Sequence, residues 1–539
     1  MGREKRIAGL FGLLMTGFLI CVLGVMGAAF HGDELAQAAA RQSTYQLTVS
    51  RSRGDFYDCT GQKLTGRNQE TLAAVAPTVE AAGRMASLVD GEYRQAVGSA
   101  LASGTPFLAR VPAGTESSVG IDVFSVTDRY SEEQLASNLI GYVDGRGNGA
   151  AGLEKAFDAA LHLDGSLQVT YSVDAVNRVL NSADREISDT RTQGEKGVFL
   201  TIDRRIQKIV EEACREAELD KGAVVVLEVE TGEIRALASL PSLQPDNIAE
   251  DLENPDGPLI NKALSAYSVG SVFKLVSAAA ALEAGITPEY AYYCDGSIEV
   301  DGQEFRCFDG TAHGTVTMAN AISRSCNGYF VSLMQQVDPA EFLEMAKSLG
   351  FGQESVFAPG YTGAAGTLPT EDSLLVKRAL ANFSFGQGDL TATPVQVAAM
   401  TAAVASGGLY REPSLVKGVA DLSTGEYVYL QPTGEKRTVM SMKTASLLRS
   451  FMEKAVEEGT AKAGKPESVS AGAKTGTAQT GQSMEEGEVV QLWYTGYFPA
   501  QAPRYVVTVL RADSTDNGKQ GAAVFQKIAD QLEKQGFLS

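Results

Sequence analysis

The chain has 539 residues, of which 44% are hydrophobic and 21% are charged, enough to build two or more ordinary globular domains. Its formal net charge of -20 argues against a nucleic-acid partner, because phosphate backbones attract basic surfaces. Only three histidines are present, His31, His162 and His313, so a histidine-rich metal site is excluded and a Ser-His-Asp triad would have to use one of these three, which favours a different base for a catalytic serine.

The N-terminal segment predicts a single membrane anchor. Residues 7–30 carry no charge, and about 20 apolar residues are enough to cross a bilayer as a helix. Basic residues precede this run and the acidic pair Asp33 and Glu34 follows it, so residues 1–6 should be a cytoplasmic tail and the rest extracytoplasmic. A cleaved signal peptide is the alternative, but its apolar core usually spans only about 7–15 residues.

Residues 31–195 form a polar region that is predicted to be a separate N-terminal domain of mixed α/β structure. Residues 45–49 alternate as a strand does, whereas residues 70–89 have a helical pattern. A second domain is predicted to follow at residues 196–539.

The second domain is predicted to be α+β, with helices packed on an antiparallel sheet. Asp203 is expected to cap a helix over residues 204–217. The strand-like runs 223–227 and 233–238 flank a Thr-Gly turn and predict a hairpin. Further helical patterns lie at 271–284, 317–334 and 394–406, and strands at 492–497 and 505–510 precede a closing helix at 522–535.

The six cysteines form neither a CxxC nor a zinc-ribbon pattern, so no metal site is predicted. Cys294 and Cys307 flank a strand-like stretch, residues 296–304. They either bridge a hairpin in an oxidising compartment or remain unpaired thiols, and the sequence leaves both interpretations open.

A serine and a lysine stand one helical turn apart at Ser271-Val-Phe-Lys274. Residues i and i+3 share a helix face, so an unprotonated Lys274 can take the proton of the Ser271 hydroxyl if burial lowers its pKa. The same pattern recurs at Ser414-Leu-Val-Lys417, but without helical periodicity, and there it is typical of a loop or strand edge.

Two further motifs follow. Ser325-Cys-Asn327 offers a second hydroxyl and an amide, although a helix-end cap is the simpler interpretation. Lys474-Thr-Gly-Thr477 suits a strand, because alternation puts Thr475 and Thr477 on one face, where their hydroxyls can hold a carboxylate. Gly476 would let an extended substrate backbone lie close as an added strand, and a surface turn is the alternative.

In this order the three motifs resemble those of the monofunctional class B penicillin-binding protein transpeptidases. The resemblance covers most of residues 198–539 and, more weakly, residues 45–175. It includes the Tyr267–Ser271 lead-in and Phe385-Gly-Gln-Gly388. Arg53-Gly54 with Asp58, and Gly152-Leu-Glu154, resemble the start and end of an elongated pedestal, or dimerisation-like, domain, with Cys59 where the family usually has arginine.

The resemblance implies a peptidoglycan D,D-transpeptidase with a penicillin-binding/β-lactamase-like catalytic domain that uses neither cofactor nor metal. Ser271 would be acylated by stem peptides, and β-lactam antibiotics would acylate it as substrate mimics. The implied roles are base for Lys274, proton relay for Ser325 and Lys474, substrate binding for Asn327, Thr475, Gly476 and Thr477, and an oxyanion hole from the backbone N–H groups of Ser271 and Thr477.

Three alternatives remain at this stage: a β-lactamase, a membrane β-lactam sensor and a non-catalytic cell-wall scaffold. The resemblance also suggests a polytopic glycosyltransferase partner. It leaves elongation, division and spore-wall synthesis as separate possibilities for the process served.

Overall fold

The computed structural model describes residues 2–30, 43–180, 184–192, 194–432, 434–484 and 487–538. Helix α1 (Arg3–Phe30) contains the stretch Lys5–Gly27, which is the one span among these residues long and apolar enough to cross a membrane. Its length and composition agree with the predicted anchor. Asp33 and Glu34, on which the predicted orientation depends, lie outside the described residues.

The chain divides into two compact units that interleave along the sequence. The first unit comprises residues 1–52, 68–128 and 163–193, and the second comprises residues 53–67, 129–162 and 194–539. The boundary predicted at residue 195 is a single cut, whereas the chain passes between the units several times before that residue. Two stretches of the predicted pedestal, 53–67 and 129–162, therefore pack with the second unit.

Within its described residues the first unit contains, besides α1, two three-stranded sheets, ordered β1-β6-β7 and β4-β3-β5, and a pair of helices. The elements are β1 (Thr44–Arg53), β6 (His162–Ser172), β7 (Arg185–Asp189), β4 (Phe107–Arg110), β3 (Asn68–Val75), β5 (Ile121–Asp128), α3 (Val79–Leu88) and α4 (Gly91–Ser103). The helix predicted over residues 70–89 is wrong in its first part, where β3 lies between β4 and β5. Pro77 disfavours helical backbone before it, and Thr78 caps α3 by accepting from the Ala81 N–H.

The second unit is built on a five-stranded sheet in the order β10-β9-β25-β24-β23, in which every neighbouring pair is antiparallel. Its strands are β9 (Gly222–Glu228), β10 (Ile234–Leu240), β23 (Gly472–Met484), β24 (Gly487–Phe498) and β25 (Tyr505–Ser514). The predicted hairpin and the predicted C-terminal strands are confirmed by β9–β10 and β24–β25. Strand β23, which carries the Lys-Thr-Gly motif, is one of the two outer strands of this order.

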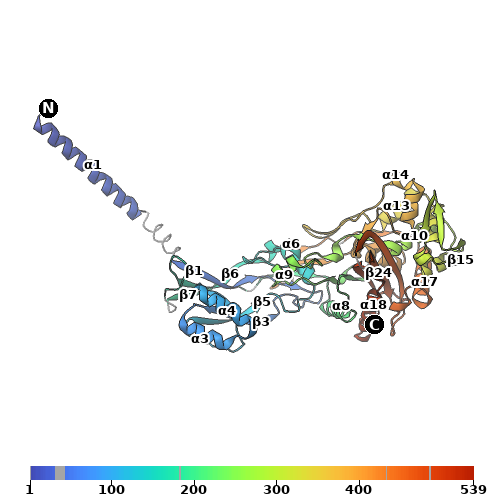
Figure 1. The fold of residues 1–539 in the computed structure, drawn as a ribbon, viewed down its shortest axis with the longest axis horizontal. Helices are drawn as coiled ribbons and strands as arrows, with labels where there is room; N and C mark the ends of the chain where they lie inside the picture. The colour runs from blue at the N-terminus through green and yellow to red at the C-terminus, as the bar shows by residue number, and fades with distance from the viewer. Residues whose placement is uncertain are drawn as a thin grey trace. The chain divides into compact units, whose positions relative to one another are not determined.

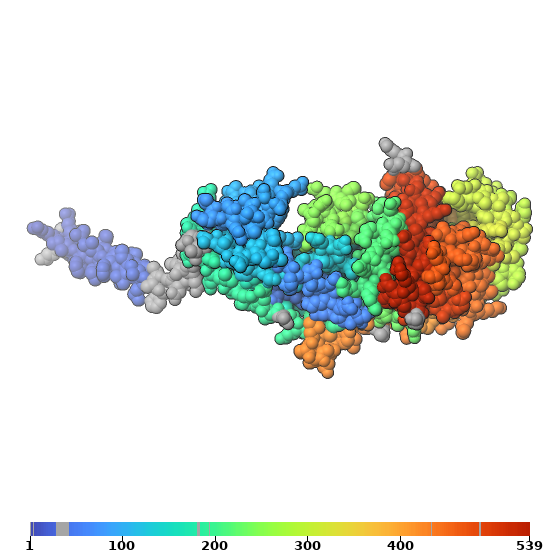
Figure 2. Space-filling view, turned by 90° about the horizontal axis from the view of Figure 1, so that it is seen from below, coloured from blue at the N-terminus to red at the C-terminus, as the bar shows by residue number. Residues whose placement is uncertain are grey.

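Helices cover both faces of the five-stranded sheet. α8 (Arg204–Glu216) and the closing helix α18 (Gln520–Lys534) pack together against one face. There α18 contacts β24 (Figure 1). At the surface, α18 lies beside the green segment that contains α8 (Figure 2). α16 (Pro394–Ala405) is apolar and buried along its whole length against the other face. Asp203 caps α8, as predicted, by accepting from the Arg205 N–H at 2.9 Å.

The remaining elements surround this layered core. The helices are α5 (Ser137–Ile140), α6 (Gly152–Ala156), α7 (Asp158–Leu161), α9 (Ile248–Glu253), α10 (Lys274–Glu283), α11 (Met318–Arg324), α12 (Asn327–Met334), α13 (Pro339–Ser348), α14 (Glu371–Leu374), α15 (Lys377–Ser384) and α17 (Met442–Glu458). The strands are β2 (Phe56–Tyr57), β8 (Lys196–Leu200), β11 (Tyr267–Ser268), β12 (Tyr292–Cys294), β13 (Ser297–Val300), β14 (Gln303–Arg306), β15 (Gly314–Val316), β16 (Ser355–Ala358), β17 (Tyr361–Gly363), β18 (Thr391–Ala392), β19 (Leu409–Arg411), β20 (Val416–Asp421), β21 (Tyr427–Leu430) and β22 (Lys436–Thr438).

A buried ion cluster joins the two stretches of the second unit that precede residue 194. The Glu154 carboxylate is fully buried and forms salt bridges with Arg53, at 2.8 Å, and with Arg129, at 2.6 Å. Arg53 also pairs with Asp158 at 2.8 Å. Arg53 and Glu154 belong to the two short motifs at the ends of the predicted pedestal. Their salt bridge brings these motifs together in space, although the two residues are 101 residues apart in sequence.

We expect Glu154→Ala to lower the free energy of unfolding by about 3–5 kcal/mol, because it removes the one fully buried carboxylate that pairs with two largely buried arginines. The control Glu216→Ala removes a surface pair with Lys527 (side chains 60% and 39% exposed) and should cost less than about 1 kcal/mol. Thermal unfolding followed by the fluorescence of Trp493, the single, buried tryptophan, measures both variants. Equal melting temperatures for the two variants would contradict a stabilising role for the cluster.

Candidate active site

Ser271 lies in a short 3-10 turn, Gly270–Phe273, that is held between two other parts of the second unit. The Gly270 N–H donates to Gly386 O at 2.8 Å, which ties the turn to the Phe385–Gly388 loop. Gly270 has a φ of +63°, and a Cβ there would lie only 2.5 Å from Thr477 O. Only glycine allows this close approach, which brings half-buried Ser271 beside strand β23.

The helix behind Ser271 begins later than the pattern over residues 271–284 predicts. The first residues form the 3-10 turn, and the α-helical hydrogen bonding of α10 starts at Lys274. Its end agrees with the prediction, because Gly285 has a φ of +86° and its N–H donates to Leu282 O at 3.1 Å. Ser271 is therefore at the N-terminal end of this helix, one turn before Lys274.

Lys274 is fully buried, and its ammonium nitrogen is surrounded by oxygen atoms. Nζ donates to Asn327 Oδ1 at 2.6 Å, to Ser325 O at 2.7 Å and to Ser325 Oγ at 3.1 Å. Burial disfavours the charged form and lowers the pKa of Lys274 to about 7, although negative charge on the nearby thiols Cys326 and Cys307 acts in the opposite direction. A substantial fraction of this amine is thus neutral near physiological pH and able to accept a proton.

Ser325 interrupts the helical pattern predicted over residues 317–334, which is two helices rather than one. α11 ends at Arg324, Ser325 adopts left-handed backbone with φ +57°, and α12 begins at Asn327. A left-handed residue other than glycine costs roughly 1–2 kcal/mol, and such strain concentrates at functional sites. Ser325 does occupy the C-cap position of α11, but its hydroxyl lies between two lysine amines instead of capping the helix.

Lys474 is the second of these lysines and is also fully buried, on strand β23. Its Nζ donates to Ser325 Oγ at 3.0 Å and to Thr475 O at 2.7 Å. Burial, together with the nearby charge of Lys274, lowers the pKa of Lys474 well below its usual value. A hydroxyl has one proton and two lone pairs, so Ser325 can accept from one amine while donating to the other once that amine is neutral.

Strand β23 shows the period-two alternation that the sequence predicts. Lys474 and Gly476 are buried, whereas Thr475 and Thr477 are half-buried on the opposite face. Gly476 packs against the nucleophile turn, since a Cβ there would lie 3.0 Å from Val272 Cγ1. The Thr475 hydroxyl is within 2.7 Å of the Thr460 hydroxyl.

Asn327 connects Lys274 to a neighbouring hairpin. Its Oδ1 accepts from Lys274, and its Nδ2 donates to Arg306 O, the last residue of β14, at 2.8 Å. The amide predicted to hold a substrate thus also orients the lysine. The structure brings Lys274, Ser325, Asn327 and Lys474 into one hydrogen-bonded group, with Ser271, Thr475 and Thr477 on the segments beside it.

The second Ser-x-x-Lys copy has no such surroundings. Ser414 makes an isolated parallel bridge with Glu233, its N–H donates to Gly232 O at 3.0 Å, and Lys417 lies on strand β20. The extended backbone here agrees with the predicted loop or strand edge.

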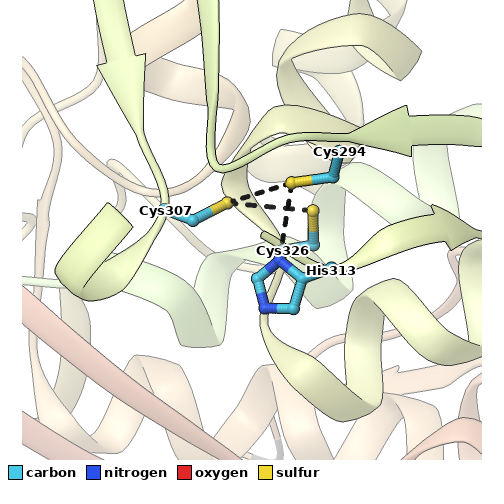
Figure 3. A group of neighbouring side chains, drawn as sticks. All are labelled: Cys294, Cys307, His313 and Cys326. Carbon is cyan, nitrogen blue, oxygen red and sulfur yellow. Dashed lines mark hydrogen bonds between the residues drawn. The ribbon is translucent and has the colours of Figure 1, made fainter. Parts of the chain in front are cut away.

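Sequence reasoning missed a cluster of four side chains next to this group: Cys294, Cys307, His313 and Cys326. Their sulfur and nitrogen atoms all lie within 4.8 Å of one another (Figure 3). The Cys294 and Cys307 sulfurs are 3.6 Å apart, too far for the bridge that the sequence left open, which requires about 2.05 Å. The sequence signal that could have found this cluster is local enrichment and not a spaced motif. Three of the six cysteines and one of the three histidines fall between residues 294 and 326.

Comparisons with known proteins show which family the chain resembles. Residues 222–530 match the family model described as "Penicillin binding protein transpeptidase domain". Stage V sporulation protein D of Bacillus subtilis is 31% identical over 405 residues, covering 72% of this chain. Peptidoglycan D,D-transpeptidase PbpA of Mycolicibacterium smegmatis is 30% identical, covering 72% of this chain and 79% of that protein.

The fold is likewise similar to a solved structure, penicillin-binding protein 3 of Mycobacterium tuberculosis complexed with aztreonam. The TM-score is 0.66 at 24% identity, with 92% of this chain and 98% of that chain covered. The match to the sporulation protein spans only 60% of that relative's own length.

Proposed function

Because the chain belongs to the penicillin-binding protein transpeptidase family, we propose that it is a membrane-anchored peptidoglycan D,D-transpeptidase with Ser271 as its nucleophile. The observation that carries the proposal is a pair of buried lysines, Lys274 and Lys474, that share the Ser325 hydroxyl. Lys274 lies one helical turn after Ser271. Serine is activated by an adjacent base, and this group supplies one without histidine.

Acylation begins when Ser271 Oγ attacks the carbonyl carbon of the penultimate D-Ala of a stem peptide. Neutral Lys274 takes the hydroxyl proton as the new C–O bond forms, and its pKa of about 7 matches this task. The backbone N–H groups of Ser271 and Thr477 stabilise the negative charge on the carbonyl oxygen. The C–N bond to the terminal D-Ala then breaks, and the departing amine takes a proton through Ser325 from Lys474 or Lys274.

An amine from a second stem peptide completes the reaction. It attacks the acyl-Ser271 carbonyl, loses a proton to the same relay, and releases Ser271 as the cross-link forms. The donor peptide lies extended along the outer strand β23, where Thr475 and Thr477 hold its terminal carboxylate and Gly476 leaves room for its backbone. Asn327 contributes to substrate binding while it orients Lys274. β-Lactams acylate Ser271 as mimics of the D-Ala-D-Ala bond.

The anchor sets where this chemistry takes place. With residues 1–6 in the cytoplasm and helix α1 crossing the membrane, the catalytic domain lies outside the cell beside its substrate. A polytopic glycosyltransferase in the same membrane would supply the uncross-linked strands. Co-purification in mild detergent tests this partner, and its repeated failure would count against it.

The experiment that tests the function is a cross-linking assay. The detergent-solubilised chain is given uncross-linked peptidoglycan strands, and cross-linked muropeptide dimers and free D-Ala are measured by mass spectrometry. We expect dimers and D-Ala, both abolished by a β-lactam. Rapid hydrolysis of the β-lactam without dimers would indicate a β-lactamase, and a stable adduct without dimers would indicate a sensor. If the chain forms neither an adduct nor dimers, the remaining interpretation is a non-catalytic scaffold.

A further inference from the structure

We propose that Cys294, Cys307, His313 and Cys326 bind one zinc ion, and that this ion fixes the Ser325–Asn327 motif in place. The inference goes beyond the proposed acyl transfer, in which none of these four side chains takes part. In Figure 3 the three sulfur atoms and the imidazole, which come from separate segments, face a common centre.

The spacing of the donor atoms fits a tetrahedral zinc site. Zn–S bonds of about 2.3 Å and Zn–N bonds of about 2.0–2.1 Å at tetrahedral angles place two sulfurs about 3.8 Å apart, and a sulfur and a nitrogen about 3.6 Å apart. The observed separations are 3.6 Å for Cys294 and Cys307, 3.9 Å for Cys307 and Cys326, and 3.5 Å from Cys294 Sγ to His313 Nδ1. Three thiolates and one imidazole are a donor set typical of structural zinc.

Burial and backbone hydrogen bonds hold the four donors in position. The three cysteines are buried and the histidine is half-buried. The Cys307 N–H donates to Gly296 O at 2.9 Å, and the His313 N–H donates to Cys294 O at 3.1 Å.

The position of the cluster gives the ion its role. Cys326 is the middle residue of the Ser325–Asn327 motif and the N-cap of α12. Cys307 follows Arg306, whose carbonyl accepts from Asn327 Nδ2. An ion bound by Cys326 and Cys307 therefore holds the residue before Asn327 and the residue after Arg306, which accepts from the Asn327 amide. Because Asn327 Oδ1 accepts from Lys274, the ion also fixes the orientation of that lysine. Since four protein donors complete the tetrahedron, the ion is structural and takes no substrate.

Metal analysis of the full chain tests the site. The protein is purified from zinc-supplemented medium in detergent, its affinity tag is removed, and bound metals are measured by mass spectrometry. We expect one zinc per chain, lost in Cys307→Ser and in His313→Ala but retained in Cys214→Ser, a buried thiol on α8 outside the cluster. Zinc-free wild type, a different bound metal, or a Cys294–Cys307 disulfide in a non-reduced digest would overturn the proposal.

A second measurement uses the wild-type chain and does not depend on the folding of variants. Chelated wild-type protein is titrated with cobalt(II), and we expect the visible absorption of tetrahedral cobalt with thiolate charge-transfer bands. Acylation by a fluorescent penicillin should slow on chelation and recover when zinc is added back. An octahedral cobalt spectrum, or a chelated protein that acylates at the original rate, would contradict the site or its role. A labelled but zinc-free wild type would overturn the zinc site alone and leave the proposed function intact.

Discussion

Ser271→Ala is expected to abolish covalent labelling by a fluorescent penicillin. A methyl group has no oxygen with which to open the β-lactam ring, so the loss should be complete rather than graded. Gel fluorescence of the solubilised chain after reaction with the penicillin measures it. The buried positions around the turn are unaffected by removal of one half-buried hydroxyl, and the variant should unfold at the wild-type temperature.

The matched control is Ser414→Ala, because Ser414 begins the second Ser-x-x-Lys copy of the chain. It lies on extended backbone beside Glu233, away from the lysine pair, and the variant should label as wild type does. Labelling that survives Ser271→Ala and disappears in Ser414→Ala would reverse the assignment of the nucleophile.

Lys274→Met is expected to slow acylation by about 10²- to 10⁴-fold, the range that a positioned general base usually contributes. Methionine nearly preserves the buried volume and removes the amine, so the loss reports proton transfer rather than packing. Stopped-flow measurement of the second-order acylation rate constant is the test. Lys417→Met, in the second copy, is the control and should react at the wild-type rate.

The same lysine predicts the pH dependence of acylation. The base must be neutral, and burial lowers the pKa of Lys274 to about 7, so protonation removes it as the pH falls below that value. The wild-type rate should then decrease about tenfold per pH unit, and the residual rate of Lys274→Met should lack this limb. A wild-type rate that stays constant from about pH 8 to about pH 5 would exclude Lys274 as the titrating base.

Much of the second unit could be predicted because local signals and tertiary structure agree there. Asp203 precedes an amphipathic helix, and a Thr-Gly turn joins the strands of the β9–β10 hairpin. The pattern over residues 317–334 failed for the opposite reason. It covers two helices, and Ser325, which was expected near a helix end, has left-handed backbone between them while its hydroxyl contacts two buried lysines.

The catalytic motifs could be located by sequence, but their connections could not. Alternation along β23 predicts that Lys474 points away from Thr475 and Thr477, which left unexplained how it reaches the site. The structure brings Ser325 from a helix break to the buried side of the strand, where Lys474 lies. The zinc ligands were missed because their segments are 6 to 13 residues apart, and their grouping depends on how β12, β14, β15 and α12 pack.

The most direct test of the central claim is the identification of the acylated residue in the wild-type chain. After reaction with a β-lactam, the protein is digested and the modified peptide is sequenced by mass spectrometry. We predict one adduct per chain, on Ser271. An adduct on Ser325 or Ser414, or a chain that carries no adduct at saturating β-lactam, would contradict the account.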